Sequence, residues 1–66
     1  MVPDYRAIRE AVALSRDKVA ARADTSHQTA RLCEIAGPTA IRSPAIRARL
    51  VAVYDDLRKQ AEAKAA

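Results

Sequence analysis

Large aromatic side chains are almost missing from this chain. Its 66 residues include no tryptophan, no phenylalanine and only two tyrosines. Alanine accounts for sixteen of the 33 hydrophobic residues, whereas leucine, isoleucine and valine together supply thirteen. Alanine lets helices approach closely but buries little area, and apolar burial stabilises a fold by roughly 25 cal/mol per Å². We therefore expect one small domain of modest stability, or one that gains stability from a partner subunit.

Cysteine and histidine each occur only once. They cannot build a disulfide framework or a zinc site, which fits a reducing cytosol. A catalytic pair of Cys33 and His27 is formally possible, but Cys33 falls on the apolar side of a predicted helix, which favours a small buried thiol. The sequence has no paired carboxylates facing a cleft, no glycine-rich phosphate loop and no metal-ligand cluster. It therefore predicts no enzyme, no cofactor or metal and no small-molecule ligand.

Long apolar runs are also lacking, and the beginning "MVPDYR" has no signal-peptide segment, so we expect a soluble cytoplasmic protein. A role at a membrane surface is disfavoured because no predicted helix has a strongly apolar, aromatic face.

Acidic residues are outnumbered by basic ones: the chain has eight Asp and Glu and twelve Lys and Arg, a formal net charge of +4. This balance favours a polyanionic partner, nucleic acid first, over a merely solvated surface.

Helix formers dominate and strong breakers are rare, so the sequence predicts an all-α fold, a compact bundle of about four helices with a long C-terminal helix. Pro3 and Asp4 suit a first turn, and Ser15 and Ser43 are good N-caps. Gly37-Pro38 stops the third helix. The expected helices cover residues of about 4–13, 16–23, 27–35 and 44–62, and residues 39–42 form a connector.

The second and third of these helices meet at a short polar turn. Asp24 occupies a position where helices commonly end in a left-handed residue, and Thr25 or Ser26 can cap the next helix. Ala20 and Ala30 are small enough to let the two helices cross closely, which predicts a helix-turn-helix.

At residues 14–34, "LSRDKVAARADTSHQTARLCE" resembles the Cro/C1-like helix-turn-helix regulators (the XRE family), and "RSPAIRARLVAVYDDL" resembles their fourth helix. Asp24 replaces the usual turn glycine and Thr25 the usual apolar residue. Ala30 is smaller than the typical isoleucine or valine, and Arg16 stands where the family has a glutamine that contacts a phosphate. The matching residues are Leu14, Ser15, Val19, Ala20, Ala23, Ser26, Thr29 and Glu34, with Cys33 at an apolar site.

The resemblance implies a sequence-specific transcriptional regulator, of the repressor type, whose helix 27–35 enters the major groove of double-stranded DNA. Gln28 can address adenine, Arg31 a phosphate or a guanine, and His27 a phosphate or base unless it merely caps the helix. Leu32 could contact a thymine methyl group, or pack under the C-terminal helix or against another subunit. The predicted DNA-binding residues are Arg16, Ser26, His27, Gln28, Arg31, Leu32, Arg42 and Arg47.

A homodimer on a two-fold-related site is expected because one such module buries little area. The candidate seam is the stripe Ile46, Leu50, Val53 and Leu57, although the same stripe could instead close the core of one copy. The alternative function is a protein-interaction module, antitoxin-like or adaptor-like, that uses the face of Leu32 and Ile35. Bound to DNA, the regulator would be associated with the nucleoid.

Overall fold

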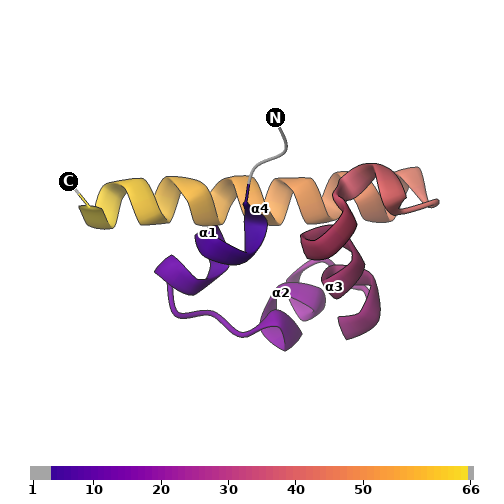
Figure 1. Ribbon diagram of the computed structural model, residues 1–66, viewed down its shortest axis with the longest axis horizontal. Coiled ribbons are helices and arrows are strands. Elements are labelled where there is room, and N and C mark those ends of the chain that lie inside the picture. Colours follow the sequence, from indigo (N-terminus) through magenta and orange to yellow (C-terminus); the bar gives the residue numbers. More distant parts are fainter. Residues whose placement is uncertain (1–3, 66) are drawn as a thin grey trace.

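Four α-helices and one short 3₁₀ helix make up residues 4–65, the part of the chain that the computed structural model describes (Figure 1). No strand occurs within these residues, so the all-α prediction is confirmed. The radius of gyration of 11.0 Å is close to that of a compact chain of this length, about 10.8 Å. The elements are α1 (Tyr5–Ala11), α2 (Arg16–Arg22), α3 (His27–Ala36), η1 (Pro38–Ala40) and α4 (Pro44–Ala65).

Two helix starts follow the predicted N-caps Ser15 and Ser43, whereas Asp4, predicted in the first turn, is the N-cap of α1. Asp4 accepts the backbone N–H of Ala7 at 3.1 Å, and Ser15 accepts that of Lys18 at 3.3 Å. Ser43 accepts the backbone N–H of Ile46 at 3.3 Å, directly before Pro44. Side-chain oxygens at these positions satisfy N–H groups that have no partner inside the helix. The predicted role of Pro3 lies outside the described residues.

Two helix ends use left-handed residues, of which only one was predicted. Asp24 and Ala13 both have φ 53°. After each, the chain closes with paired backbone bonds, such as Thr25 N–H to the Ala20 carbonyl at 2.9 Å and Leu14 N–H to the Arg9 carbonyl at 3.2 Å. These bonds occupy carbonyls that the helix leaves free. Because of this closure at Ala13, α1 is shorter than predicted, whereas α4 continues to Ala65, past the predicted end.

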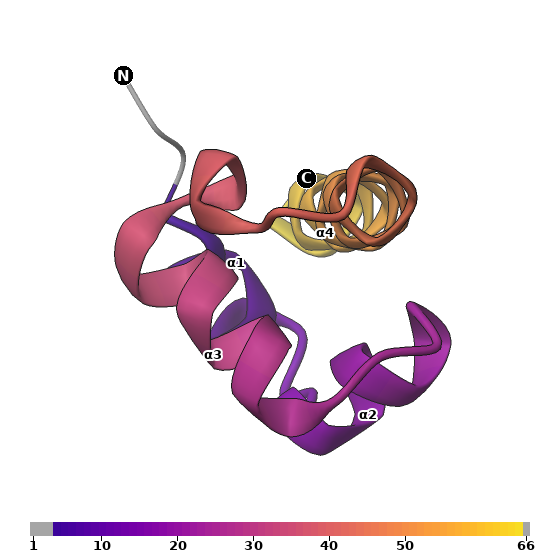
Figure 2. The ribbon, with the colours of Figure 1, turned by 90° about the vertical axis from the view of Figure 1, so that its right-hand side faces the viewer.

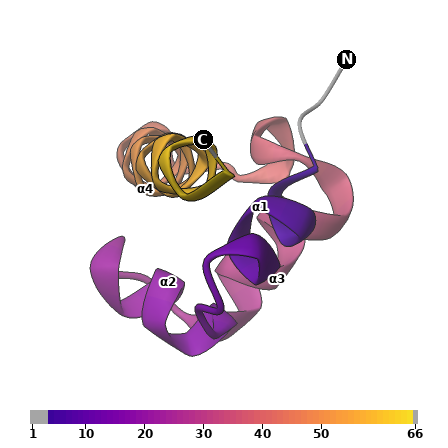
Figure 3. The ribbon, with the colours of Figure 1, turned by 90° about the vertical axis from the view of Figure 1, so that its left-hand side faces the viewer.

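The long helix α4 runs along one side of the molecule, and α1, α2 and α3 lie on the opposite side of the molecule (Figures 1 to 3). It packs against α1, α2 and η1, while α3 packs against α2, η1 and α1. Ala20 and Ala30 are both buried, as the predicted close approach of α2 and α3 requires. The view along α4 shows α2 and α3 set at a steep angle to each other (Figure 2).

The core holds a pair of stacked tyrosines. The rings of Tyr5 and Tyr54 are stacked with centroids 4.6 Å apart, and Tyr54 is fully buried. Cys33 is fully buried, as expected for a small structural thiol, and burial raises its pKa to about 11. Such a pKa keeps the sulfur protonated and unreactive near neutral pH.

The stripe proposed as a dimer seam closes the core of a single copy instead. Leu50 and Leu57 are fully buried, and Ile46 and Val53 are partly buried against the same cluster. Leu50 and Leu57 therefore cannot meet a second copy unless the core opens. The spacing of the stripe fitted either role, and in this structure Leu50 and Leu57 take the core role.

Candidate nucleic-acid interface

One side of α3 is exposed along the length of the helix. Gln28, Arg31, Leu32 and Ile35 recur at three- and four-residue spacing, which places them on one side of an α-helix. We call these four residues the outer face of α3. Leu32 is 42% exposed and Ile35 66% exposed, so neither is covered by α4. With the rest of residues 4–65, the side chains of Gln28 and Arg31 make no hydrogen bond or ion pair.

The beginning of α3 is fixed by its neighbours. The Ser26 hydroxyl accepts the backbone N–H of Thr29 at 3.2 Å and lies 2.8 Å from the Thr29 hydroxyl, so it serves as the N-cap. Nδ1 of His27 pairs with the carboxylate of Asp17, near the start of α2. This contact joins the two helix starts, and it is neither of the roles predicted for His27. The imidazole is still half-exposed.

The opposite side of α3 carries a buried carboxylate. The side chain of Glu34 is only 1% exposed and receives donors from three other helices. Nε of Arg9 donates to Oε2 at 2.7 Å, Nη2 of Arg16 to Oε1 at 3.1 Å, and the hydroxyl of Tyr54 to Oε2 at 2.6 Å. We call these four residues the Glu34 cluster. It ties α1, α2 and α4 to the inner side of α3.

The electrostatics of the cluster keep Glu34 ionised. Burial alone would raise the pKa of Glu34, but the hydrogen bonds from Arg9, Tyr54 and Arg16 together lower it below its ordinary value. The pKa of Tyr54 is raised by burial and by its bond to Glu34. No side-chain polar atom buried in residues 4–65 lacks a hydrogen-bond partner. The cluster is therefore an internally satisfied network rather than an open site.

Both arginines of the cluster are engaged inside the fold. Arg16, one of the predicted DNA-binding residues, holds Glu34 together with Arg9. A signal was present in the sequence: Glu34 follows Cys33 and lies one turn after Ala30, on the apolar side of the helix. A carboxylate in that position needs cationic or hydrogen-bonding partners. Helical periodicity shows on which side of the helix Glu34 lies, but it does not show which residues bond to it.

The other arginines differ in whether their side chains are already engaged within the fold. Arg42 is exposed and has no hydrogen bond or ion pair with any of residues 4–65. Arg47 instead donates to the Ile41 carbonyl at 2.6 Å and 3.2 Å, and thereby braces the connector. Arg49 is exposed and donates to the Ala23 carbonyl at 2.8 Å. Arg31 and Arg42 are thus the predicted arginines that remain available to an anion.

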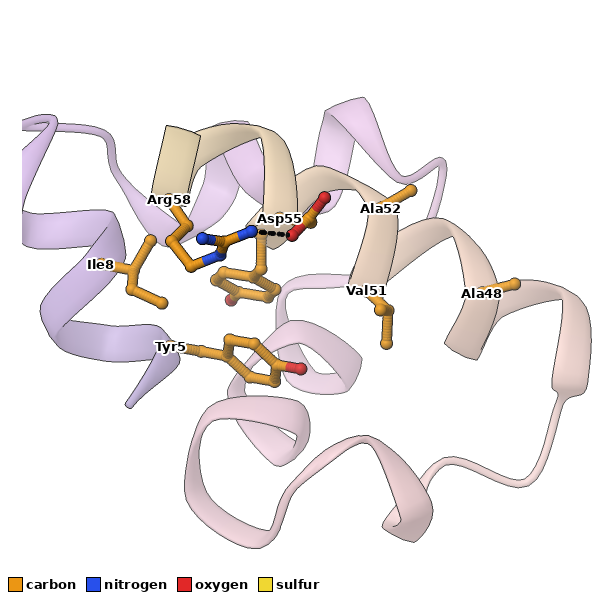
Figure 4. A pocket seen from close by; sticks show the side chains of 8 residues that line it. Tyr5, Ile8, Ala48, Val51, Ala52, Asp55 and Arg58 are labelled. Atoms are coloured by element: carbon orange, nitrogen blue, oxygen red, sulfur yellow. Dashed lines mark hydrogen bonds and ion pairs between the residues drawn. The ribbon is translucent and has the colours of Figure 1, made fainter. Parts of the chain in front are cut away.

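The surface of residues 4–65 includes two hollows that are defined by their lining residues. The larger, about 410 Å³, lies between α1 and α4 (Figure 4). Tyr5 and Ile8 line it from α1, and Val51 and the ion pair of Arg58 with Asp55, at 2.8 Å, line it from α4. The smaller hollow, about 270 Å³, lies beside the outer face of α3. Its walls are Thr29, Leu32, Ala40, Ile41, Arg42, Ser43 and Ile46.

Residues 4–65 contain no group of three or more metal-ligating side chains and no helix long and apolar enough to cross a membrane. Comparisons of the chain with protein-family models, curated proteins and solved structures find no match.

Proposed function

We propose that this protein is a sequence-specific DNA-binding transcriptional regulator of the helix-turn-helix type, in which α3 is the recognition helix. The single observation that carries the proposal is the division of α3 into two sides. Its inner side is fixed to three other helices through Glu34, while its outer face projects Gln28 and Arg31 without partners among residues 4–65. A rigid helix with free donors on its outer face suits insertion into a major groove.

The local geometry and charge support this role. The turn between α2 and α3 is short, Asp24 takes the left-handed conformation that lets the chain reverse, and two alanines allow close packing. The start of α3, where base-contacting residues of such modules lie, carries Gln28. The formal charge of +4 favours a polyanion. Arg31 and Arg42 supply cations near the outer face, and Gln28 supplies a group that can read adenine.

The biological role that follows is repression by occupancy. A single module of this size contacts few base pairs, so we expect two copies on a two-fold-related operator, where they would block polymerase. Because Leu50 and Leu57 are buried inside one copy, contacts between copies would use other surfaces.

Selection of duplexes from a random pool, followed by salt titration of the selected duplex, tests the proposal. We expect an enriched sequence with two-fold symmetry and a logarithmic affinity that falls linearly with the logarithm of salt concentration. Arg31→Ala should reduce that slope by about 0.9 for each phosphate that the variant no longer neutralises. Arg6→Ala, which removes an exposed charge from α1, is the matched control and should leave the slope nearly unchanged. Failure to bind any duplex at low salt contradicts the proposal.

A second candidate function rests on the apolar end of the outer face. Ile35, at 66% exposure, is the most exposed large hydrophobic side chain in residues 4–65. Such a residue suits contact with a protein partner, as in an antitoxin-like or adaptor-like module. Absence of DNA binding at low salt, together with a specific protein complex that Ile35→Asp disrupts, would favour this function over the first.

A further inference from the structure

We infer that the hollow beside α3 receives the methyl group of a thymine in the operator, with Leu32 against that methyl group and Arg42 on the adjacent phosphate. This inference rests on the proposed function and names the chemistry of one position in the DNA site. It starts from two features that the helix-turn-helix arrangement leaves unexplained. Leu32 is an exposed apolar residue among hydrogen-bonding groups, and Arg42 is an exposed cation at the edge of the same hollow.

Apart from Arg42, the wall of the hollow offers mainly apolar surface. Leu32, Ala40, Ile41 and Ile46 contribute aliphatic groups. The two hydroxyls in the wall already have partners: that of Thr29 lies 2.8 Å from the Ser26 hydroxyl, and that of Ser43 accepts the Ile46 N–H. Away from Arg42, an incoming polar edge would therefore lose hydrogen bonds to water with little replacement. A methyl group would not.

Thymine is the base that presents a methyl group in the major groove. That methyl lies at the edge of the base nearest to the backbone of its own strand, so a side chain that contacts it is close to a phosphate of that strand. The hollow has the matching arrangement, because the cation of Arg42 borders the apolar wall formed by Leu32. Gln28, one turn before Leu32 on the outer face, would then contact a neighbouring base pair.

Exchange of thymine for deoxyuridine tests the inference because it removes only the methyl group. In the duplex selected by the wild-type protein, each thymine is replaced in turn, symmetrically in both half-sites, and affinity is measured by fluorescence anisotropy. We expect one position at which the exchange weakens wild-type binding by about fourfold per half-site, the effect of leaving one methyl group unburied. Leu32→Ala should bind both duplexes equally. Val51→Ala, which shortens an exposed apolar residue of α4, should keep the wild-type preference.

The phosphate contact is tested on the same duplexes. A neutral methylphosphonate placed beside the sensitive thymine should weaken binding of the wild type, whereas Arg42→Ala should be indifferent to it. Equal binding of thymine and deoxyuridine duplexes by the wild type would overturn the inference and leave the proposed function intact. So would a methyl preference that persists in Leu32→Ala. If the selection enriches no duplex at all, the proposed function fails first, and this inference fails with it.

Discussion

The two sides of α3 differ in what holds them. On the inner side, Glu34 is nearly inaccessible and receives donors from α1, α2 and α4. On the outer face, Gln28 and Arg31 are exposed and make no side-chain hydrogen bond within residues 4–65, and Ile35 is largely exposed. The same helix thus has one side that determines where it sits and another that is free for a partner. Substitutions on the two sides should separate stability from binding.

The largest change in stability is expected for a substitution on the inner side of α3. Glu34→Ala leaves Arg9 and Arg16 largely buried without their anion and Tyr54 without its acceptor. Breaking a buried ion pair in this way typically costs about 3–5 kcal/mol. Urea denaturation should show this loss in the free energy of unfolding. The control is Glu62→Ala, which removes an exposed ion pair with Arg58 and should change stability by about 0.5 kcal/mol or less. Similar losses in both variants would contradict the role of the cluster.

On the outer face, Gln28→Ala should affect binding and not stability. Removal of a bidentate hydrogen-bonding group should relax preference at one base position by about 1–3 kcal/mol. The free energy of unfolding should stay within about 0.5 kcal/mol of the wild-type value, because the side chain is exposed. Affinities for a set of single-base variants of the selected duplex measure the first quantity. A uniform loss over all sequences would contradict the assignment of Gln28 as a base reader.

Protonation of Glu34 at acid pH should lower the free energy of unfolding by less than the Glu34→Ala substitution does. Glu34 has a lowered pKa in the fold, so the unfolded chain binds its proton more readily and stability from this group is present above its ordinary pKa. That contribution is lost as pH falls from the ordinary pKa through the lowered one. Unfolding free energies measured across this interval should therefore decrease more in the wild type than in Glu34→Gln. If the plots of unfolding free energy against pH are parallel for the two proteins, Glu34 does not contribute to the loss of stability in acid.

The smallest expected effect is a gain. Ala13 ends α1 with φ 53°, a conformation that glycine adopts without the steric cost imposed by a Cβ atom. Ala13→Gly should raise the free energy of unfolding by about 0.5–1 kcal/mol, since the relief exceeds the added flexibility of the unfolded chain. Ala11→Gly, inside the same helix, is the matched control and should lower stability by a similar amount. Thermal melts of both variants test whether Ala13→Gly is stabilising and Ala11→Gly destabilising.

Local signals predicted the helices well. Ser15, Ser26 and Ser43 each cap the helix that the sequence assigned to them, and Asp24 has the left-handed backbone expected from its position. These features depend on residues within one turn of each other, which the sequence places side by side. Ala13 was missed because alanine carries no preference for positive φ.

The partners of side chains could not be predicted in the same way. Arg9 is 25 positions from Glu34, and Tyr54 is 20 positions away. Helical periodicity shows which side of a helix is apolar but not which side chains cross to it from other helices. The role of the stripe containing Leu50 could not be predicted either, because stripes that face the core and stripes that face a second subunit have the same residue spacing. Arg47 and Arg49 bond to carbonyls that the sequence gives no reason to single out.

The tyrosine stack gives the molecule a built-in optical probe. The chain has no tryptophan, and its only two tyrosines lie face to face, one from the first helix and one from the last. Near-ultraviolet circular dichroism and tyrosine emission therefore arise entirely from this junction. Loss of that signal would report separation of α1 from α4 without any label. It would do so even in variants whose helix content, measured in the far ultraviolet, is unchanged.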